Sequence, residues 1–255
     1  MRVQDSIAIV TGGASGLGEG TVRQIVEGGG KASILDMAEE KGRRLVEELG
    51  ENVIFSKTDV TNEEEVKKAM DRTEESFGSF NTVINCAGIG IAEKTVSRGR
   101  AHSYESFKKV VEINLMGTFN VIRLVAERLV GNPVNENGER GVIINTASVA
   151  AYEGQIGQAA YSASKGGVAG MTLPIARDLA KSGIRVVTIA PGLIDTPLFG
   201  GLSDEMRASL ETHIPFPSRL GHPTEYAQLV SSIIENAYLN GGVIRLDGAL
   251  RMPPQ

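Results

Sequence analysis

The chain has 255 residues, of which 41% are hydrophobic and 22% are charged. This balance excludes disorder as the main state, because the apolar residues are numerous and evenly spread. The formal net charge of −5 disfavours a general nucleic-acid binder, which needs a basic surface. The single cysteine excludes a fold held by internal disulfides. We therefore expect a globular domain with no nucleic-acid partner.

The start of the chain carries no recognisable targeting signal. Only a few polar residues precede the first apolar run at 6–11, which leaves no room for a basic region, an apolar region and a cleavage site. No apolar stretch approaches the ~20 residues that a membrane helix needs. We expect a cytoplasmic protein without a membrane partner.

Short runs rich in β-branched residues alternate with longer stretches of helical periodicity. The runs lie at 7–11, 32–36, 53–57, 82–86, 142–146, 185–190 and 243–246, and the helical stretches lie at 17–28, 39–49, 62–77, 104–130, 158–181 and 224–236. Alternation of this kind predicts βαβ units, and nearly continuous apolar runs indicate strands buried on both faces. We expect an α/β fold with a doubly wound parallel sheet (a Rossmann fold), in a single domain over 1–255.

A long connection follows the run at 185–190. Residues 191–223 are rich in proline and glycine, and a loop of this length in a compact domain is usually functional. We expect a substrate lid at about 193–216. Its apolar side chains are suited to wrap an apolar substrate: Leu193, Leu198, Phe199, Leu202 and Phe216.

The first strand leads directly into a glycine-rich turn. Three glycines, Gly12, Gly16 and Gly18, permit a tight turn, close backbone approach and close packing of the next helix. The start of that helix then offers free N–H groups to a pyrophosphate. A plain strand-to-helix turn is the alternative, but the context of strand, turn, helix and distal acid favours dinucleotide binding.

Asp36 lies at the end of the second predicted strand, twenty residues beyond Gly16. A carboxylate at this point can accept hydrogen bonds from both ribose hydroxyls and repels a ribose 2′-phosphate. Ser15 and Met37 stand where a phosphorylated cofactor would need a basic residue. The sequence therefore favours NAD over NADP.

Two further strand ends point to the same crevice. Asp59-Val60 closes the third strand, and Asn85-Cys86-Ala87-Gly88 closes the fourth. Asp59 can accept a hydrogen bond from an adenine amino group, or it can cap the following helix. Gly88 indicates close approach to the cofactor, whereas Cys86 has the features of a small apolar residue rather than a nucleophile.

Tyr161 and Lys165 are four residues apart at the start of a predicted helix, so they share one helical face. An adjacent ammonium is expected to lower the pKa of the phenol, which is otherwise near 10. Ser148, at the end of the fifth strand, can hold a substrate oxygen beside that phenol. Asn114 is an unfavourable residue inside a helix, which indicates either a specific role or a surface position.

In order and spacing, these motifs resemble the short-chain dehydrogenase/reductase family over essentially the whole chain. The matching positions are Thr11-Gly12, Gly16 and Gly18, the Asn85–Gly88 turn, Asn114, Ser148, Tyr161 and Lys165, and Pro191-Gly192. The resemblance implies a seven-stranded parallel sheet and a dimer or tetramer. It implies that Tyr161 is the general acid/base and that Lys165 lowers its pKa and holds the nicotinamide ribose. It also implies that Ser148 orients the substrate oxygen and that Asn114 keeps a proton-relaying water.

Longer stretches, including 114–126, 141–151, 157–167 and 215–221, resemble one subgroup of that family, the type-II 3-hydroxyacyl-CoA dehydrogenases. Members of this subgroup are NAD-dependent tetramers that act on 3-hydroxyacyl-CoA and some hydroxysteroids. The resemblance implies Gln155 as a neighbour of the substrate. It implies these cofactor contacts: Gly12, Ser15, Gly16, Leu17, Gly18, Asp36, Asp59, Val60, Cys86, Ala87, Gly88, Tyr161, Lys165, Pro191, Gly192, Ile194 and Thr196. In the animal members of this subgroup, an aromatic residue stands at the position of Ile194.

The predicted substrate is a small molecule, either an acyl-CoA or another apolar alcohol. Residues 91–109 carry five basic residues (Lys94, Arg98, Arg100, Lys108 and Lys109) against two acidic ones, which suits the phosphates of coenzyme A. A solvated basic loop is the alternative. The three histidines, His102, His213 and His222, are too scattered for a metal site, so we expect none.

Two other functions remain open on the sequence. One is an NADPH-dependent 3-oxoacyl-carrier-protein reductase of the same family, which Asp36 disfavours. The other is a dinucleotide-binding regulatory or scaffold protein without turnover, which has no need for Asn114, Ser148, Tyr161 and Lys165 together.

Overall fold

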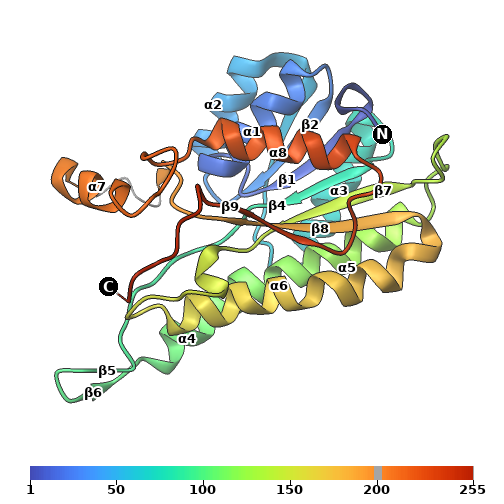
Figure 1. Ribbon diagram of the computed structural model, residues 1–255. Helices are drawn as coiled ribbons and strands as arrows, with labels where there is room; N and C mark the ends of the chain where they lie inside the picture. Colours follow the sequence, from blue (N-terminus) through green and yellow to red (C-terminus); the bar gives the residue numbers. More distant parts are fainter. Residues whose placement is uncertain (198–202, 255) are drawn as a thin grey trace.

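The computed structural model describes residues 1–197 and 203–254, and a parallel sheet forms its centre (Figure 1). Seven strands lie in the order β3-β2-β1-β4-β7-β8-β9. They are β1 (Ile7–Thr11), β2 (Lys31–Asp36), β3 (Val53–Lys57), β4 (Thr82–Asn85), β7 (Gly141–Thr146), β8 (Ile184–Pro191) and β9 (Val243–Leu246). The strand order reverses between β1 and β4, which opens a crevice at their carboxyl ends. The predicted doubly wound sheet is confirmed.

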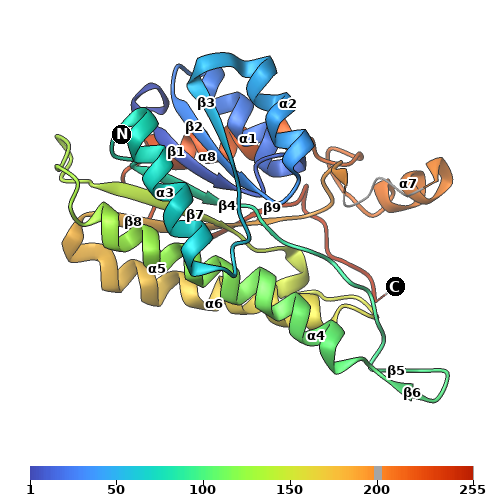
Figure 2. The ribbon, with the colours of Figure 1, turned by 180° about the vertical axis from the view of Figure 1, so that it is seen from behind.

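Helices cover both faces of the sheet (Figures 1 and 2). One layer holds α1 (Gly16–Glu27), α2 (Glu39–Leu49) and α8 (Pro223–Glu235), and the other holds α3 (Glu63–Phe77), α5 (Thr118–Leu129) and α6 (Ala159–Leu179). Successive residues of β7 point to opposite faces of the sheet and pack in different apolar cores. Val142 and Ile144 pack in the core under α1 and α8, whereas Ile143 packs in the core under α3 and α5. Burial on both faces explains why these strands read as continuous apolar runs.

The structure departs from the predicted elements at three places. The connection before 104 contains a small hairpin of β5 (Val96–Ser97) and β6 (Arg100–Ala101), which projects from the body of the protein (Figure 2). The predicted helix 104–130 is divided into α4 (Tyr104–Val111), a π-helical segment (Glu112–Gly117) and α5. The predicted lid contains a helix, α7 (Asp204–Glu211). Short 3₁₀ turns lie at Val3–Asp5, Gly50–Asn52, Val149–Ala151 and Ala180–Ser182.

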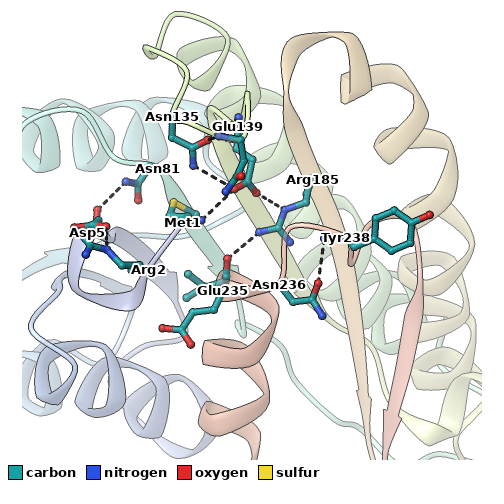
Figure 3. Close-up of polar contacts among 12 residues, drawn as sticks. Met1, Arg2, Asp5, Asn81, Asn135, Glu139, Arg185, Glu235, Asn236 and Tyr238 are labelled. Carbon is teal, nitrogen blue, oxygen red and sulfur yellow. Dashed lines mark hydrogen bonds and ion pairs between the residues drawn. The ribbon is translucent and has the colours of Figure 1, made fainter.

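A buried ion pair ties the amino ends of β7 and β8 to their neighbours (Figure 3). Arg185 donates to Glu139 at 2.6 Å, and both side chains are less than a tenth exposed. The same guanidinium donates to the carbonyl oxygens of Ile233, Ile234 and Leu239 at 2.8 to 3.0 Å. The amino group of Met1 lies 3.1 Å from the other oxygen of Glu139. This cluster lies at the edge of the sheet opposite the crevice, so its part is to hold elements together.

Within 1–197 and 203–254, we find no helix with the length and apolar character needed to cross a bilayer.

Candidate active site

The glycine-rich turn between β1 and α1 requires its glycines for two different reasons. Gly12 and Gly16 have φ angles of +63° and +54°, in the left-handed region that favours glycine. Gly18 is needed for space, because a Cβ there would lie 2.1 Å from the carbonyl oxygen of Gly12. A Cβ on Gly12 would lie 2.8 Å from the backbone nitrogen of Ala87. The turn is therefore pressed against the end of β4, and the start of α1 opens into the crevice with its N–H groups available.

Asp36 faces this turn from the end of β2. Its carboxylate accepts a hydrogen bond from Ala14 N at 3.0 Å and another from Ala38 N at 2.9 Å. Each oxygen keeps a second lone pair, so the group is held in place and can still accept from a ligand. Lys57 pairs with Asp36 in the strand register, but its ammonium lies 3.6 Å from the Glu39 carboxylate.

Asp59 and Val60 mainly stabilise the loop after β3. The Asp59 carboxylate accepts from the backbone and hydroxyl of Thr61 at 2.9 and 2.7 Å. The cap of α3 is Asn62, whose side chain accepts from Glu64 N and Glu65 N, so the alternative of Asp59 as the helix cap is wrong. Val60 is buried and would meet a Cβ on Gly117 at 2.6 Å.

A cavity of about 480 Å³ opens at the carboxyl ends of β1, β4, β7 and β8. It joins the glycine turn to the predicted proton-transfer residues. Its wall includes these predicted residues: Gly12, Ser15, Leu17, Gly18, Cys86, Gly88, Ser148, Gln155, Tyr161, Lys165, Pro191, Gly192, Ile194 and Thr196. The other predicted residues, Gly16, Asp36, Asp59, Val60, Ala87 and Asn114, lie outside this wall. Gly16 still adjoins it, because a Cβ there would lie 3.3 Å from the Thr196 side chain.

Tyr161 and Lys165 share one face of α6 beside Ser148. The Lys165 ammonium lies 5.8 Å from the centroid of the Tyr161 ring and donates to the carbonyl oxygen of Thr146 at 2.7 Å. Ser148 stands before the turn at Val149–Ala151, where its hydroxyl oxygen accepts from Ala150 N at 3.1 Å. A phenol, a hydroxyl and an ammonium thus converge on one cavity, which is suited to move a proton to or from a substrate oxygen.

The expected lowering of the Tyr161 pKa is not seen in this structure. Burial raises the pKa of Tyr161, and only a hydrogen bond with Ser148 opposes this effect. Burial also lowers the pKa of Lys165 to about 8. Desolvation dominates because Lys165 is buried and Tyr161 is partly buried in the cavity wall, where their charged forms are disfavoured. The phenol is therefore neutral at pH 7 in the protein alone.

Asn114 is fully buried in the π-helical segment, so the alternative of a surface position is wrong. Its side-chain nitrogen donates to the carbonyl of Ile89 at 2.9 Å and to the Ser164 hydroxyl at 3.1 Å, while its oxygen accepts from Ile89 N at 2.8 Å. A Cβ on Gly88 would lie 3.2 Å from that oxygen and 3.5 Å from the Lys165 nitrogen. Asn114 therefore fixes the loop after β4 directly behind Lys165. A π segment at a functional position is a common arrangement.

Comparison with known proteins agrees with this geometry. The family model described as short chain dehydrogenase matches residues 6–207. The chain is 55% identical to 3-hydroxyacyl-CoA dehydrogenase type-2 of Bos taurus over 99% of this chain and 97% of the relative. It is 51% identical to the protein of that name in Drosophila melanogaster, over 99% of this chain and 100% of the relative. The crystal structure of 3-hydroxyacyl-CoA dehydrogenase type-2 from Mycobacterium avium superposes with a TM-score of 0.94, at 45% identity over 97% of this chain and 96% of that one.

The chain belongs to the short-chain dehydrogenase family.

This short-chain dehydrogenase is an oxidoreductase, and its crevice fits a nicotinamide dinucleotide. The turn at Gly12 to Gly18 would meet the pyrophosphate, because it lines the cavity at the start of α1, where helix N–H groups face a ligand. Asp36 would meet the adenosine ribose with the lone pairs that Ala14 and Ala38 leave free. Near Tyr161, the cavity offers Lys165 as a donor.

Several residues of the cavity wall were missed in the sequence. Thr146 lines the cavity and its carbonyl holds Lys165. Its hydroxyl lies 2.7 Å from that of Tyr226, a fully buried residue of α8 that is not part of the wall. Leu210 of α7 and Met252 near the end of the chain also line the cavity. No motif in the sequence marks Leu210 or Met252. Leu210 lies within the predicted lid, whose apolar residues we expected to contact the substrate.

Cys86 lines the cavity between these groups. Its sulfur lies 3.5 Å from the Thr146 hydroxyl and 3.6 Å from the Tyr226 hydroxyl, and burial raises its pKa. A thiol with a raised pKa is a weak nucleophile, which agrees with its interpretation as a packing residue.

The lid differs from the prediction in one side chain. Leu193 is buried and lines the cavity, but Phe216 is 82% exposed, so it does not wrap a substrate in this structure. The other three apolar lid residues, Leu198, Phe199 and Leu202, lie outside the described residues. Among the described residues, no three His, Cys, Asp or Glu side chains cluster as a metal ion requires.

Proposed function

We propose that this short-chain dehydrogenase interconverts 3-hydroxyacyl-CoA and 3-oxoacyl-CoA with NAD as its cofactor. The observation that supports the reaction most directly is the convergence of Tyr161, Ser148 and Lys165 on one cavity beside the glycine turn. The names of the relatives, at 51 to 55% identity, support the substrate.

In this proposal the bound cofactor supplies the hydride acceptor for oxidation and the donor for reduction. The chain holds the substrate oxygen between the Ser148 hydroxyl and the Tyr161 phenol. In reduction, the neutral phenol donates its proton to the forming alkoxide, and the Lys165 ammonium stabilises the phenolate that remains. Oxidation runs in reverse and requires the phenolate. The raised pKa of Tyr161 keeps the phenol protonated at pH 7 in the protein alone, which is the form that reduction requires.

The Asp36 carboxylate is the main support for NAD rather than NADP as the cofactor. The group is fixed by two backbone N–H groups at the end of β2, where a 2′-phosphate would meet a negative charge. The nearest cation in the register, Lys57, is turned towards Glu39. The NADPH-dependent reductase remains the alternative that the cofactor measurement decides.

The substrate assignment is supported by a second hollow of about 600 Å³ next to the first. The two share Ala150, Gln155 and Gln158 in their walls, so a long substrate can extend from one into the other. Lys94 lines the second hollow, and the exposed side chains of Arg98 and Arg100 lie on the adjacent hairpin. A cationic rim of this kind suits the phosphates of coenzyme A.

One assay tests the reaction and the cofactor together. The protein is mixed with acetoacetyl-CoA and either NADH or NADPH, and the absorbance of the reduced nicotinamide is followed. We expect faster loss with NADH. Faster loss with NADPH would support the carrier-protein reductase, and no loss with either would support a scaffold protein.

We also propose a homotetramer in the cytoplasm. Exposed apolar side chains on the outer helices, including Met116, Phe119 and Leu173, and the edge strand β9 are suited to contacts between copies. Light scattering on the purified protein tests the assembly, and a monomeric mass would contradict it. Microscopy of a tagged chain tests the location.

A further inference from the structure

The segment after β9 returns across the molecule to the active-site cavity. Figure 1 shows this dark red segment running past the carboxyl ends of the strands towards the loop before α6. Leu250 is fully buried, and Met252 lines the cavity. Residues 247–254, the terminal strap, therefore form one side of the site although no motif marks them.

Three hydrogen bonds fix the terminal strap to the loop at 153–156. Met252 N donates to Glu153 at 3.1 Å, Gln155 Nε2 donates to the carbonyl oxygen of Pro253 at 3.2 Å, and Ile156 N donates to that of Pro254 at 2.9 Å. Gln155 belongs to the cavity wall, so the strap and the Gln155 side chain are held in a fixed relation.

Arg245 of β9 links the loop at 153–156 to the terminal strap. It donates to Glu153 at 2.8 Å and to the carbonyl oxygen of Leu250 at 3.0 Å. Burial opposes the ion pairs that Glu153 makes, but the hydrogen bond from Arg245 is the larger effect and lowers the pKa of Glu153. The carboxylate therefore stays charged at neutral pH and keeps its bond to Met252 N.

The other side of the strap packs against the lid. Leu250 shares an apolar cluster with Leu193, Ile214 and Leu220, and two partly buried residues pack against this cluster, Leu210 of α7 and Met252. These same two residues line the cavity. The lid and the strap thus meet where the cavity is apolar, and an acyl chain extending from the reacting carbon would run between them.

We infer that Met252, together with Leu210, sets the length of acyl chain that the enzyme accepts. This inference rests on the proposed acyl substrate. A methionine side chain is long and unbranched, so it fills the space that a longer acyl chain would need. Shortening residue 252 opens that space and leaves the strap's hydrogen bond at this residue intact, because that bond uses its backbone N–H.

The test measures kcat/KM for the reduction of straight-chain 3-oxoacyl-CoA substrates of four and eight carbons. In Met252→Ala, we expect the eight-to-four-carbon ratio to rise about tenfold or more, since one methylene in an apolar pocket already changes specificity by about tenfold. The KM for NADH should not change. Met206→Ala is the matched control, because Met206 lies on α7 but is 56% exposed and does not line the cavity. Its ratio should stay within about twofold of the wild type.

A second variant, in which the expected change has the opposite sign, distinguishes a loss of pocket space from a folding defect. Met252→Phe should lower the same ratio about tenfold, since it adds volume to the wall. An unchanged ratio in both folded variants, or an equal change in Met206→Ala, would overturn the inference.

The same ratio is also measured with 3-oxo methyl esters, which lack coenzyme A. If the wild type reduces the esters but no thioester, the acyl-CoA function is wrong, while the effect of residue 252 is still read on the esters. If the thioesters react and neither series responds to residue 252, the function stands and the inference on Met252 is wrong.

Discussion

The Lys165 ammonium lies 5.8 Å from the centroid of the Tyr161 ring, and its hydrogen bond goes to the Thr146 carbonyl oxygen. The two groups to which we assign proton transfer are therefore close but not bonded in the protein alone. Burial acts on both, raising the pKa of the phenol and lowering that of the ammonium. The pH dependence of the enzyme follows from this arrangement.

The reductive reaction should lose rate in alkaline solution. It needs a neutral Tyr161 and a charged Lys165, and the pKa of Lys165 is about 8. We expect kcat/KM for reduction, which reports the free enzyme, to be level below this pH and to fall above it. A profile measured across this range with acetoacetyl-CoA and NADH checks the point. A level profile well beyond pH 8 would show that Lys165 keeps its proton.

Asp36 should control the choice of cofactor. Asp36→Asn keeps one acceptor oxygen but loses the negative charge and one of the two hydrogen bonds from Ala14 N and Ala38 N. We expect the ratio of kcat/KM for NADH over NADPH to fall at least about tenfold, equivalent to ~1.4 kcal/mol. The measurement is steady-state kinetics with each cofactor. An unchanged ratio would exclude a ribose contact for this carboxylate.

Gly18→Ala should weaken cofactor binding. The new Cβ would lie 2.1 Å from the Gly12 carbonyl oxygen, so the turn has to move away from its position. We expect the affinity for NADH, measured by fluorescence titration, to fall at least about tenfold. Gly170→Ala is the control. Gly170 is an exposed residue inside α6 with no atom near its Cβ position, so this change should leave NADH affinity unchanged and stabilise the helix by ~1 kcal/mol.

The buried Arg185–Glu139 pair should stabilise the fold without affecting catalysis. Arg185→Met leaves the Glu139 carboxylate buried without its guanidinium, and we expect the free energy of unfolding to fall by ~3–5 kcal/mol. Denaturant titration measures this loss. In Arg43→Met, which breaks the exposed Arg43–Glu39 pair, stability should hardly change.

The Arg185–Glu139 pair should also make the stability of the fold depend on pH, and the direction of this dependence follows from the Glu139 pKa. Burial acts to raise the pKa of Glu139, but Arg185 and Asn135 outweigh it, so the pKa is lowered in the fold. A carboxyl with a lowered folded pKa contributes stability above its ordinary pKa of ~4.3, and this contribution is lost as the pH falls through the folded value. The stability difference between the wild type and Arg185→Met should therefore shrink in acid. A constant difference would contradict this reading.

The sequence predicted the sheet and the crevice at the carboxyl ends of its strands because both depend on local signals. Strand runs, the spacing from Gly16 to Asp36 and the four-residue step from Tyr161 to Lys165 each fix geometry within one βα unit or helix turn. The direction of the Tyr161 pKa was not accessible in this way, because it depends on how deeply the folded chain buries the ring. Met252 was missed for a related reason, since only tertiary packing brings it to the cavity.

The most direct test of the account is Tyr161→Phe, which removes only the hydroxyl. We expect kcat for acetoacetyl-CoA reduction to fall about 10³-fold or more, the range for loss of a general acid. The affinity for NADH, measured by fluorescence titration on the same protein, should stay within about twofold of the wild type. Turnover near the wild-type rate in a variant that binds NADH normally would contradict the assignment of Tyr161 as the proton donor.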